Sequence, residues 1–183
     1  MNTIFSEEFR HQRSILINNI SVDLIKNQFS DHLINATISI EDKRFYSHYG
    51  HDIFSIFRAI INNMSKNRIQ GASTIEQQLI RIILKKNELT LKRKYFEITL
   101  STEISKRLSK SETINKYLNS YLFHSNIIGV SSLCKKENYL IDQLSNKDIY
   151  EIVARFKYPK VTKENHIRYL KRVRTIELKN NDT

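Results

Sequence analysis

Apolar side chains recur every three or four residues along most of the chain. Within residues 54–64, 75–83 and 149–156 this spacing gathers them on one side of a helix, as a stripe that needs a packing partner. Helices are expected near residues 20–37, 52–65, 73–86, 91–108, 110–122, 146–157 and 163–178, with loops at 41–51, 66–72 and 123–144. The pattern therefore predicts a compact, mainly α-helical domain in which any strand is short.

Three short sequences that cap helices agree with this assignment. A hydroxyl residue followed three positions later by an acidic residue satisfies free N–H groups where a helix begins. The pattern occurs at Ser73-x-x-Glu76, Ser109-x-x-Glu112 and Ser145-x-x-Asp148. Pro159 should interrupt the chain before the last helix, because proline cannot continue one.

The composition narrows the class further. The chain has 183 residues, so a single domain over residues 1–183 is expected, and three glycines and one proline are too few for the many turns of a sandwich or barrel. The lone Cys134 excludes an intramolecular disulfide and a cysteine-based zinc site. Glycine-rich nucleotide-binding motifs do not occur. No apolar run approaches the ~20 residues of a membrane helix, and the first twenty residues lack a signal-peptide core.

Positive charge is concentrated near the C-terminus. The formal net charge is +11, and residues 155–179 hold nine basic and two acidic side chains, a net +7. Such a segment attracts nucleic acid, anionic lipid head groups or a pyrophosphate, and it can equally be a solvated helix face.

The segment 41–52, EDKRFYSHYGHD, is the first candidate for chemistry. Two isoleucines precede Glu41, and a carboxylate beside apolar side chains holds a proton more readily, as a general base must. The alternative is a solvated loop in which Glu41 or Asp42 pairs with Lys43 or Arg44. A metal site is a further option, with Asp42, His48, His51 and Asp52 as ligands, although their spacing matches no strong metal motif.

The segment 70–81, QGASTIEQQLIR, is the second candidate. Gly71 can adopt a positive φ and Ser73 can start a helix, whose first N–H groups would face an anion. Gln77 and Gln78 add amide groups one turn later, and Arg81 adds charge. The alternative is a well-capped amphipathic helix whose glutamine pair faces water.

Two further segments are less distinctive. In 92–97, KRKYFE, Arg93 and Lys94 are helical neighbours of Glu97, either as a surface salt-bridge ladder or as a carboxylate held among cations beside a phosphate. The segment 110–119, KSETINKYLN, is a helix that packs Ile114 and Leu118 and carries no independent catalytic signal.

Together and in this order, the four segments resemble the motifs of the peptidoglycan glycosyltransferases of family 51. This family comprises the transglycosylase module of class A penicillin-binding proteins and the monofunctional biosynthetic transglycosylases. Its first motif, EDxxFxxHxGxD, is matched in full by Glu41, Asp42, Phe45, His48, Gly50 and Asp52. Its second, GxSTIxQQLxK, is matched by Gly71, Ser73, Thr74, Ile75, Gln77, Gln78 and Leu79, with Arg81 in place of lysine. Its third, RKxxE, is met by Arg93, Lys94 and Glu97, and its fourth, KxxIxExYLN, by Lys110, Ile114, Tyr117, Leu118 and Asn119.

The chain departs from the family pattern in a few places. The glutamate of the fourth motif is Asn115, Arg81 changes the geometry of the second motif, and Ser105 stands where an acidic residue often ends the third helix. The resemblance covers about residues 20–176, and neither a transpeptidase module nor an N-terminal membrane helix accompanies it. A monofunctional form is therefore expected.

The resemblance implies a fold, a reaction and a site. The fold would be a single lysozyme-like helical domain with a small mobile lobe, and the reaction the polymerisation of lipid II into glycan strands with release of undecaprenyl pyrophosphate. Catalysis would fall to Glu41 as the general base and to Glu97, which would orient cations or hold Mg²⁺ or Mn²⁺, and no organic cofactor is implied. The implied substrate-binding residues are Asp42, Phe45, His48, Gly71, Ser73, Thr74, Gln77, Gln78, Arg81, Arg93, Lys94 and Asn119.

Partners and location follow from the same resemblance. They are lipid II and the growing glycan chain, an anionic membrane surface, and other cell-wall synthesis proteins, at the outer face of a bacterial cytoplasmic membrane, with the export route left open. Nucleic acid is not expected, because no recognised motif supports it. Two other readings stay open: a catalytically impaired relative that binds lipid II or a cell-wall partner without turnover, and a lytic enzyme that would use Glu41 as an acid.

Overall fold

The structure, a computed structural model, confirms a mainly helical chain. It describes residues 2–21, 29–55, 57, 58, 61, 73–85, 88 and 90–181. The only β-type pairing among these residues is a single bridge between Leu122 and Ile128. The chain divides into two compact units, Met1–Leu24 with Arg44–Thr113 and Ile25–Lys43 with Ile114–Thr183. A small mobile lobe stays a prediction.

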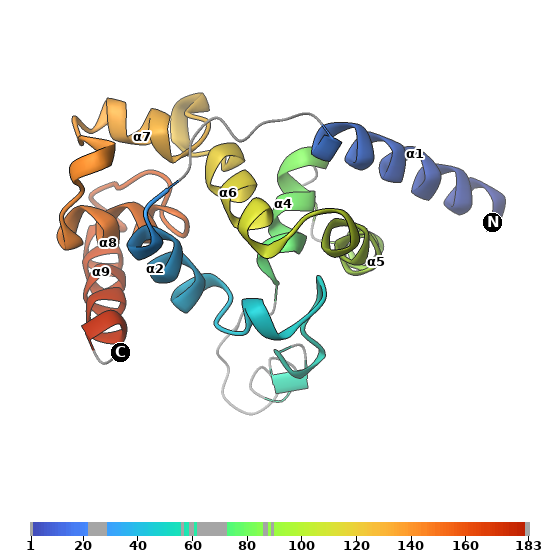
Figure 1. Cartoon of the computed structure of the whole chain (residues 1–183), viewed down its shortest axis with the longest axis horizontal. Coiled ribbons are helices and arrows are strands. Elements are labelled where there is room, and N and C mark those ends of the chain that lie inside the picture. The colour runs from blue at the N-terminus through green and yellow to red at the C-terminus, as the bar shows by residue number, and fades with distance from the viewer. Residues whose placement is uncertain are drawn as a thin grey trace. The chain divides into compact units, whose positions relative to one another are not determined.

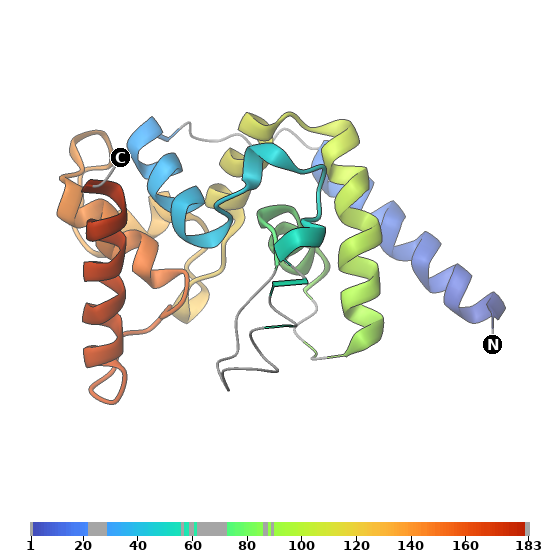
Figure 2. The same ribbon diagram turned by 90° about the horizontal axis from the view of Figure 1, so that it is seen from below.

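Three helices build the first unit. Helix α4 (Ile75–Leu84) packs against α5 (Leu91–Arg107), and α1 (Asn2–Ser21) contacts both (Figure 2). Their apolar stripes meet in a core of Leu16, Ile20, Leu79, Ile80, Phe96, Leu100 and Ile104. The 3-10 helix η1 (Phe45–Ser47) and the first turn of α6 (Lys110–Ser120) complete this unit.

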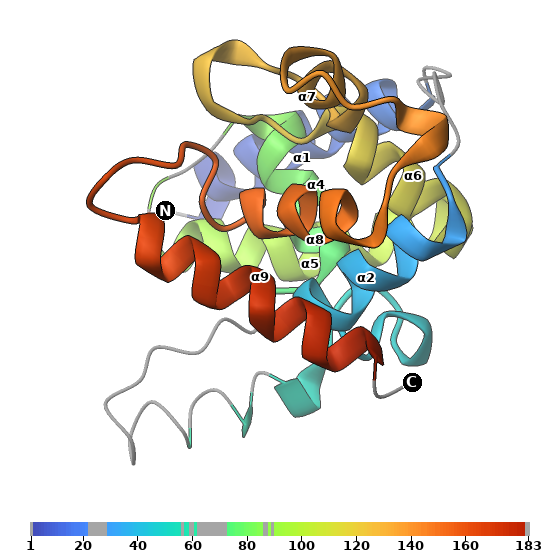
Figure 3. The ribbon, with the colours of Figure 1, turned by 90° about the vertical axis from the view of Figure 1, so that its left-hand side faces the viewer.

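The second unit is built on helices α2 (Asp31–Glu41), α8 (Asn146–Arg155) and α9 (His166–Asn181). Helices α8 and α9 lie side by side, and α2 packs against both (Figures 1 and 3). The rest of α6, η2 (His124–Asn126), α7 (Val130–Lys136) and η3 (Ile141–Gln143) also belong to it. An aromatic cluster of Tyr117, Tyr121, Phe123 and Phe156 ties α6 to the end of α8.

Most predicted helices are confirmed to within a few residues, and four predictions need correction. The helix predicted near residues 20–37 is wrong at its start, since residues 29 and 30 are not helical and α2 begins at Asp31. Residues 2–21 form a helix that periodicity did not predict, and α7 lies inside the predicted loop 123–144. Glu41 is the last residue of α2 rather than the first of a loop. Of the predicted helix 52–65, the structure describes residues 52–55, 57, 58 and 61; Asp52 is not helical, and the others are.

The capping residues were predicted correctly at two of three helix starts. Ser109 and Glu112 exchange hydrogen bonds, as do Ser145 and Asp148. At the third, α4 is capped by Thr74, whose hydroxyl accepts from the Gln77 N–H at 3.3 Å, and not by Ser73. This shift of one residue releases the Ser73 hydroxyl for other contacts.

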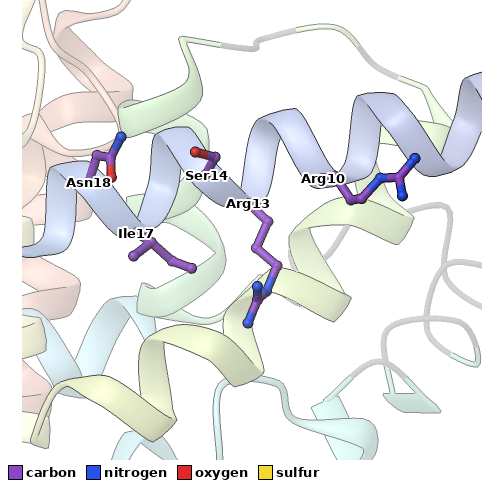
Figure 4. A pocket seen from close by; sticks show the side chains of 5 residues that line it. All are labelled: Arg10, Arg13, Ser14, Ile17 and Asn18. Atoms are coloured by element: carbon purple, nitrogen blue, oxygen red, sulfur yellow. The ribbon is translucent and has the colours of Figure 1, made fainter.

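Helix α1 carries a shallow pocket of about 220 Å³ on its surface, lined by Arg10, Arg13, Ser14, Ile17 and Asn18 (Figure 4). The Arg13 guanidinium lies 3.0 Å from Glu103 of α5, so this arginine joins the two helices. None of the residues that the sequence singled out lines this pocket. In the described part of the chain, no helix combines the length and apolar character that crossing a bilayer requires.

Candidate functional site

A buried carboxylate with three cations is the main polar feature of the first unit. Glu97 lies on α5 with 2% of its side chain exposed. Arg81 of α4 donates from Nε to Oε1 at 2.9 Å and from Nη2 to Oε2 at 3.2 Å. Arg93 donates from Nη1 to Oε1, and the Lys94 ammonium lies 3.7 Å from Oε2. The burial excludes the surface salt-bridge ladder, since an exposed ladder leaves its carboxylate in water.

Lys94 connects this cluster to the start of α4. Its Nζ donates to the Ser73 hydroxyl at 3.0 Å and to Gln77 Oε1 at 2.6 Å, so the second and third sequence motifs meet at one ammonium group. Burial lowers the pKa of Lys94 and the cations Arg81 and Arg93 lower it further, whereas Glu97 opposes them. We call Ser73, Gln77, Arg81, Arg93, Lys94 and Glu97 the cationic cluster.

Gln77 faces this cluster rather than water. Its side chain is fully buried, and its Nε2 has no hydrogen-bond acceptor among the described residues. Gln78, its neighbour, is half-buried. The alternative in which both glutamines face solvent is therefore wrong for Gln77. Gly71 lies outside the described residues.

The first motif is anchored to α4 and α5 of the same unit. The Thr74 hydroxyl donates to the Gly50 carbonyl at 2.6 Å. Gly50 has φ +88°, and a Cβ there would lie 2.2 Å from the Ser101 carbonyl oxygen, so only glycine allows this close approach to α5. Asp52 lies 3.1 Å from Arg44. Although burial opposes it, hydrogen bonds from Ser55 and the charge of Arg44 lower the pKa of Asp52 overall.

A second buried ion pair supports the same loop. Glu76 of α4 is fully buried, and its Oε1 accepts from Lys110 Nζ at 2.6 Å. The same ammonium lies 4.2 Å from the centre of the Phe45 ring, and Phe45 contacts the buried His48 edge to face. Phe45 and His48 thus shape the loop from inside. Lys110 of the fourth motif joins this loop to Glu76 in the second motif.

In the second unit, Glu41 ends α2 and faces α9. Arg172 donates from Nη2 to Glu41 Oε1 at 2.9 Å, across 131 positions of sequence. The two side chains are 22% and 16% exposed, so the pair lies at the edge of the unit and solvent reaches it. This contact to α9 was not among the pairings expected for Glu41. Asp42 follows as the buried C-cap of α2.

Asn115, which departs from the family pattern, has a structural contact in the second unit. Its Oδ1 accepts the backbone N–H of Phe29 at 3.3 Å and so holds the segment that enters α2. Asn119 donates from Nδ2 to the Asn115 carbonyl at 2.9 Å, and its own carbonyl lies against Gly129. An asparagine at 115 therefore keeps an acceptor oxygen while losing the charge of a glutamate.

Buried residues with groups of the kind that bind divalent metals include His48 and Glu76 in the first unit and Asp42 in the second. Glu76 already accepts from Lys110. Sequence reasoning missed two residues, Arg172 as the partner of Glu41 and Lys110 as the partner of Glu76. The only sequence signal for Arg172 was the basic C-terminal segment. The only signal for Lys110 was its place in the fourth motif.

Comparison with known proteins matches the motifs to a family. The sequence profile of a family described as transglycosylase matches residues 13–180. The chain is 30% identical over 186 residues to penicillin-binding protein 1A of Clostridium botulinum (strain Hall), an alignment that covers 94% of this chain and 22% of the relative. It is 35% identical over 167 residues to penicillin-binding protein 1A of Clostridium perfringens (strain 13), with 83% and 24% covered.

A third relative is penicillin-binding protein 1A of Rickettsia conorii, 38% identical over 130 residues, with 69% of this chain and 16% of the relative covered. The chain thus spans less than a quarter of the length of these relatives. The profile match nevertheless extends over nearly all of the chain and over every motif described above. The chain therefore belongs to the transglycosylase family, a family of glycosyltransferases.

Proposed function

We propose that the chain is a peptidoglycan glycosyltransferase that polymerises lipid II into glycan strands and releases undecaprenyl pyrophosphate. The observation that carries the proposal is the cationic cluster, in which three cations surround one buried carboxylate with a net charge of +2. A leaving pyrophosphate needs such fixed positive charge, because negative charge develops on it as the glycosidic bond breaks. A neutral sugar leaving group would not, which disfavours the lytic reading.

In this mechanism, Glu41 is the general base. It takes the proton from the 4-hydroxyl of the acceptor sugar as that oxygen forms a bond to the anomeric carbon of the donor chain. The bond from this carbon to the lipid pyrophosphate breaks on the opposite face, so the configuration inverts. Arg172 would orient the Glu41 carboxylate, since its guanidinium lies 2.9 Å away.

In the first unit, the cationic cluster would bind the pyrophosphate through Lys94. Lys94 is 31% exposed and is bracketed by Ser73 and Gln77, so an anion could reach it and replace these neutral partners. Thr74 and Gly50 would act indirectly, because their hydrogen bond fixes the loop that carries Phe45 and His48. Asp42 and Asn119, in the second unit, would also bind the substrate.

The substrate is a lipid, and two surfaces support a membrane-associated role. In the first unit, Tyr46, Tyr49, Ile53, Phe54, Phe57 and Ile61 are each at least half exposed within sixteen residues. In the second, the exposed residues of α9 include Arg168, Lys171, Arg174 and Lys179. Aromatic side chains and cations are the groups that favour an anionic membrane surface. We place the activity at the outer face of the bacterial cytoplasmic membrane, beside other cell-wall synthesis proteins.

The test is to incubate the purified chain with labelled lipid II and to run Glu41→Gln beside it. We expect polymer from the wild type and a rate lower by about 10³-fold from Glu41→Gln, the scale of general-base catalysis. Glu164→Gln, at a solvent-exposed position of the second unit, is the matched control and should polymerise normally. Polymer from Glu41→Gln at the wild-type rate would refute the assigned base.

The second candidate is a catalytically impaired relative that binds lipid II without turnover. The observation that favours it is Asn115, which lacks the charge of the family's glutamate. Its contact with Phe29 shows that the position still serves the fold. Lipid II binding without polymer, under conditions in which an authentic family member polymerises, would select this reading.

A further inference from the structure

Arg81 stands where the family motif has lysine, and the structure gives the arginine a contact that lysine cannot make. Its Nε and Nη2 reach the two different oxygens of Glu97, at 2.9 and 3.2 Å. This two-point fork needs a planar guanidinium, whereas a lysine ammonium is a single point of charge. The same Nη2 lies 3.5 Å from the Ser73 hydroxyl, so Arg81 spans from the carboxylate to the start of α4.

Both carboxylate oxygens of Glu97 are therefore engaged by cations. Oε1 accepts from Arg81 and from Arg93, while Oε2 accepts from Arg81 and has the Lys94 ammonium 3.7 Å away. A divalent metal at Glu97 would have to displace one of these donors and would then face three positive charges in a buried site, where repulsion is poorly screened. The residues present do not fit a metal at this carboxylate.

Arg81 is also the member of the cluster that joins two helices through Glu97. Arg93 and Lys94 lie on α5 with Glu97 itself, and Arg93 Nε donates to the Glu88 carbonyl just before that helix. Arg81 comes from α4, the helix that Thr74 caps and that carries Gln77. Removing the fork would remove the contact that holds the Glu97 side chain to α4, near the contact of Gln77 with Lys94.

We propose that Arg81 is a positioning residue that locks Glu97 and the α4–α5 pair, and that Glu97 binds no divalent metal in this chain. Glu97 thus acts as the counter-ion that orders three cations, and Lys94, Ser73 and Gln77 are left to meet the anion. The part of the proposal that concerns catalysis rests on the proposed function. The part that concerns the metal does not.

The test of metal binding uses Mn²⁺ and the full chain. We titrate Mn²⁺ into the wild type and Glu97→Gln and follow the free ion by electron paramagnetic resonance. The expected result is the same number of bound ions and the same affinity within about twofold, because any binding is at other carboxylates. Loss of one Mn²⁺ site in Glu97→Gln, with the variant folded by circular dichroism, overturns the proposal.

A second measurement needs no variant at Glu97, in case that substitution unfolds the chain. In a ¹⁵N spectrum of the wild type, the Nε–H signal of Arg81 should keep its intensity when Mn²⁺ is added at a concentration that broadens signals of exposed carboxylate-rich segments. A Mn²⁺ ion on Glu97 would lie within a few ångströms of this proton and would erase the signal. Broadening of the Arg81 signal at low Mn²⁺ overturns the proposal.

The test of the positioning role uses Arg81→Lys, which introduces the lysine of the family motif and keeps the charge. We expect kcat for lipid II to fall about tenfold while KM stays within about twofold, since the fork orders the site and does not touch the substrate. Lys94→Gln is the comparison and should raise KM. A rise in KM for Arg81→Lys shows direct substrate contact, and an unchanged kcat shows a merely structural role; each overturns the proposal.

The metal-binding experiments and the kinetic experiment distinguish failure of the proposed function from failure of this inference. If the wild type makes no polymer under any condition, the proposed function fails, while the Mn²⁺ titration and the Arg81 signal still decide the role of Glu97. If polymer forms and the Mn²⁺ experiments detect an ion on Glu97, the proposed function stands and this inference falls.

Discussion

Glu97 and Glu41 are both paired with arginine, and yet they differ in almost every other respect. Glu97 lies inside the first unit with 2% of its side chain exposed, and it is held by a two-point fork from a neighbouring helix and by cations on its own helix. Glu41 lies at the end of α2 in the second unit, 16% exposed, with an arginine from α9 at one oxygen. The first carboxylate is fixed within a network, and the second is accessible to solvent.

The difference suits the separate roles that we propose for the two carboxylates. A general base must exchange a proton with a substrate, so it needs access and some freedom to move. A counter-ion that orders cations needs burial and complete hydrogen bonding, because an uncompensated buried charge is costly. Mutation of the general base Glu41 should lower activity and leave stability nearly unchanged. Mutation of the counter-ion Glu97 should lower both.

The largest effect on stability is expected from Glu97→Gln. The substitution leaves Arg81, Arg93 and Lys94 clustered without their carboxylate, and it should lower the free energy of unfolding by about 2–3 kcal/mol, less than a fully buried pair because two of the cations are 31% exposed. Urea unfolding followed by circular dichroism measures it.

The control for this substitution is Glu103→Gln on the same helix. Glu103 pairs with Arg13 and Arg107, whose side chains are 41% and 42% exposed, so a loss of no more than about 0.5–1 kcal/mol is expected. Equal losses for the two variants would remove the distinction between a locked and an accessible carboxylate.

Arg172→Met should weaken catalysis about tenfold, which corresponds to ~1.4 kcal/mol of activation free energy. The substitution removes the contact that orients Glu41 and keeps most of the apolar stem. Arg172→Lys should recover part of the rate. Steady-state polymerisation of lipid II gives both values, and a normal rate in Arg172→Met would mean that Glu41 is oriented by other contacts.

Asn115→Ala tests the scaffold that leads into α2. It leaves the buried Phe29 N–H without this acceptor, and a loss of about 1 kcal/mol in unfolding free energy is expected. Asn115→Asp keeps an oxygen at the same place and should lose less. If alanine and aspartate behaved alike in urea unfolding, the Phe29 contact would not contribute to stability.

The smallest expected effect is a shift in pH dependence. Burial first, and then Arg81 and Arg93, hold the pKa of Lys94 below its ordinary value, so this cation is lost on the alkaline side earlier than a free lysine would be. Arg81→Gln removes one of the repelling charges and should therefore move the alkaline limb of kcat/KM to higher pH. Arg81→Lys keeps the charge and should leave the limb in place; movement in both variants would point to another titrating group.

The helices with strong periodicity were predictable from sequence, and the weaker ones were not. Helices α4 and α8 have apolar residues at helical spacing and end close to the predicted residues. Helix α1 is interrupted by charged residues, and it obtains its burial from contacts of Leu16 and Ile20 with α4 and α5, which no local pattern contains. Helix α7 has only seven residues, too few for a period to appear.

The same limit applied to the site. Spacing on one helix predicted that Arg93 and Lys94 neighbour Glu97, and the structure brings them together. The partners Arg172 and Phe29 come from 131 and 86 positions away, so only folding brings them to Glu41 and Asn115. The shift of the α4 cap from Ser73 to Thr74 was also hidden, because both hydroxyl residues can cap and the choice depends on the Gly50 carbonyl.

Gly50 also limits how this chain can vary over time. Its backbone lies so close to α5 that any side chain would collide with the Ser101 carbonyl, and its φ of +88° disfavours every other residue type. A library with all twenty amino acids at this position, selected for folded protein, should return glycine almost alone. The exposed Tyr46 and Tyr49 nearby face no such restriction. Substitutions in this loop should therefore accumulate at such exposed positions while Gly50 stays unchanged.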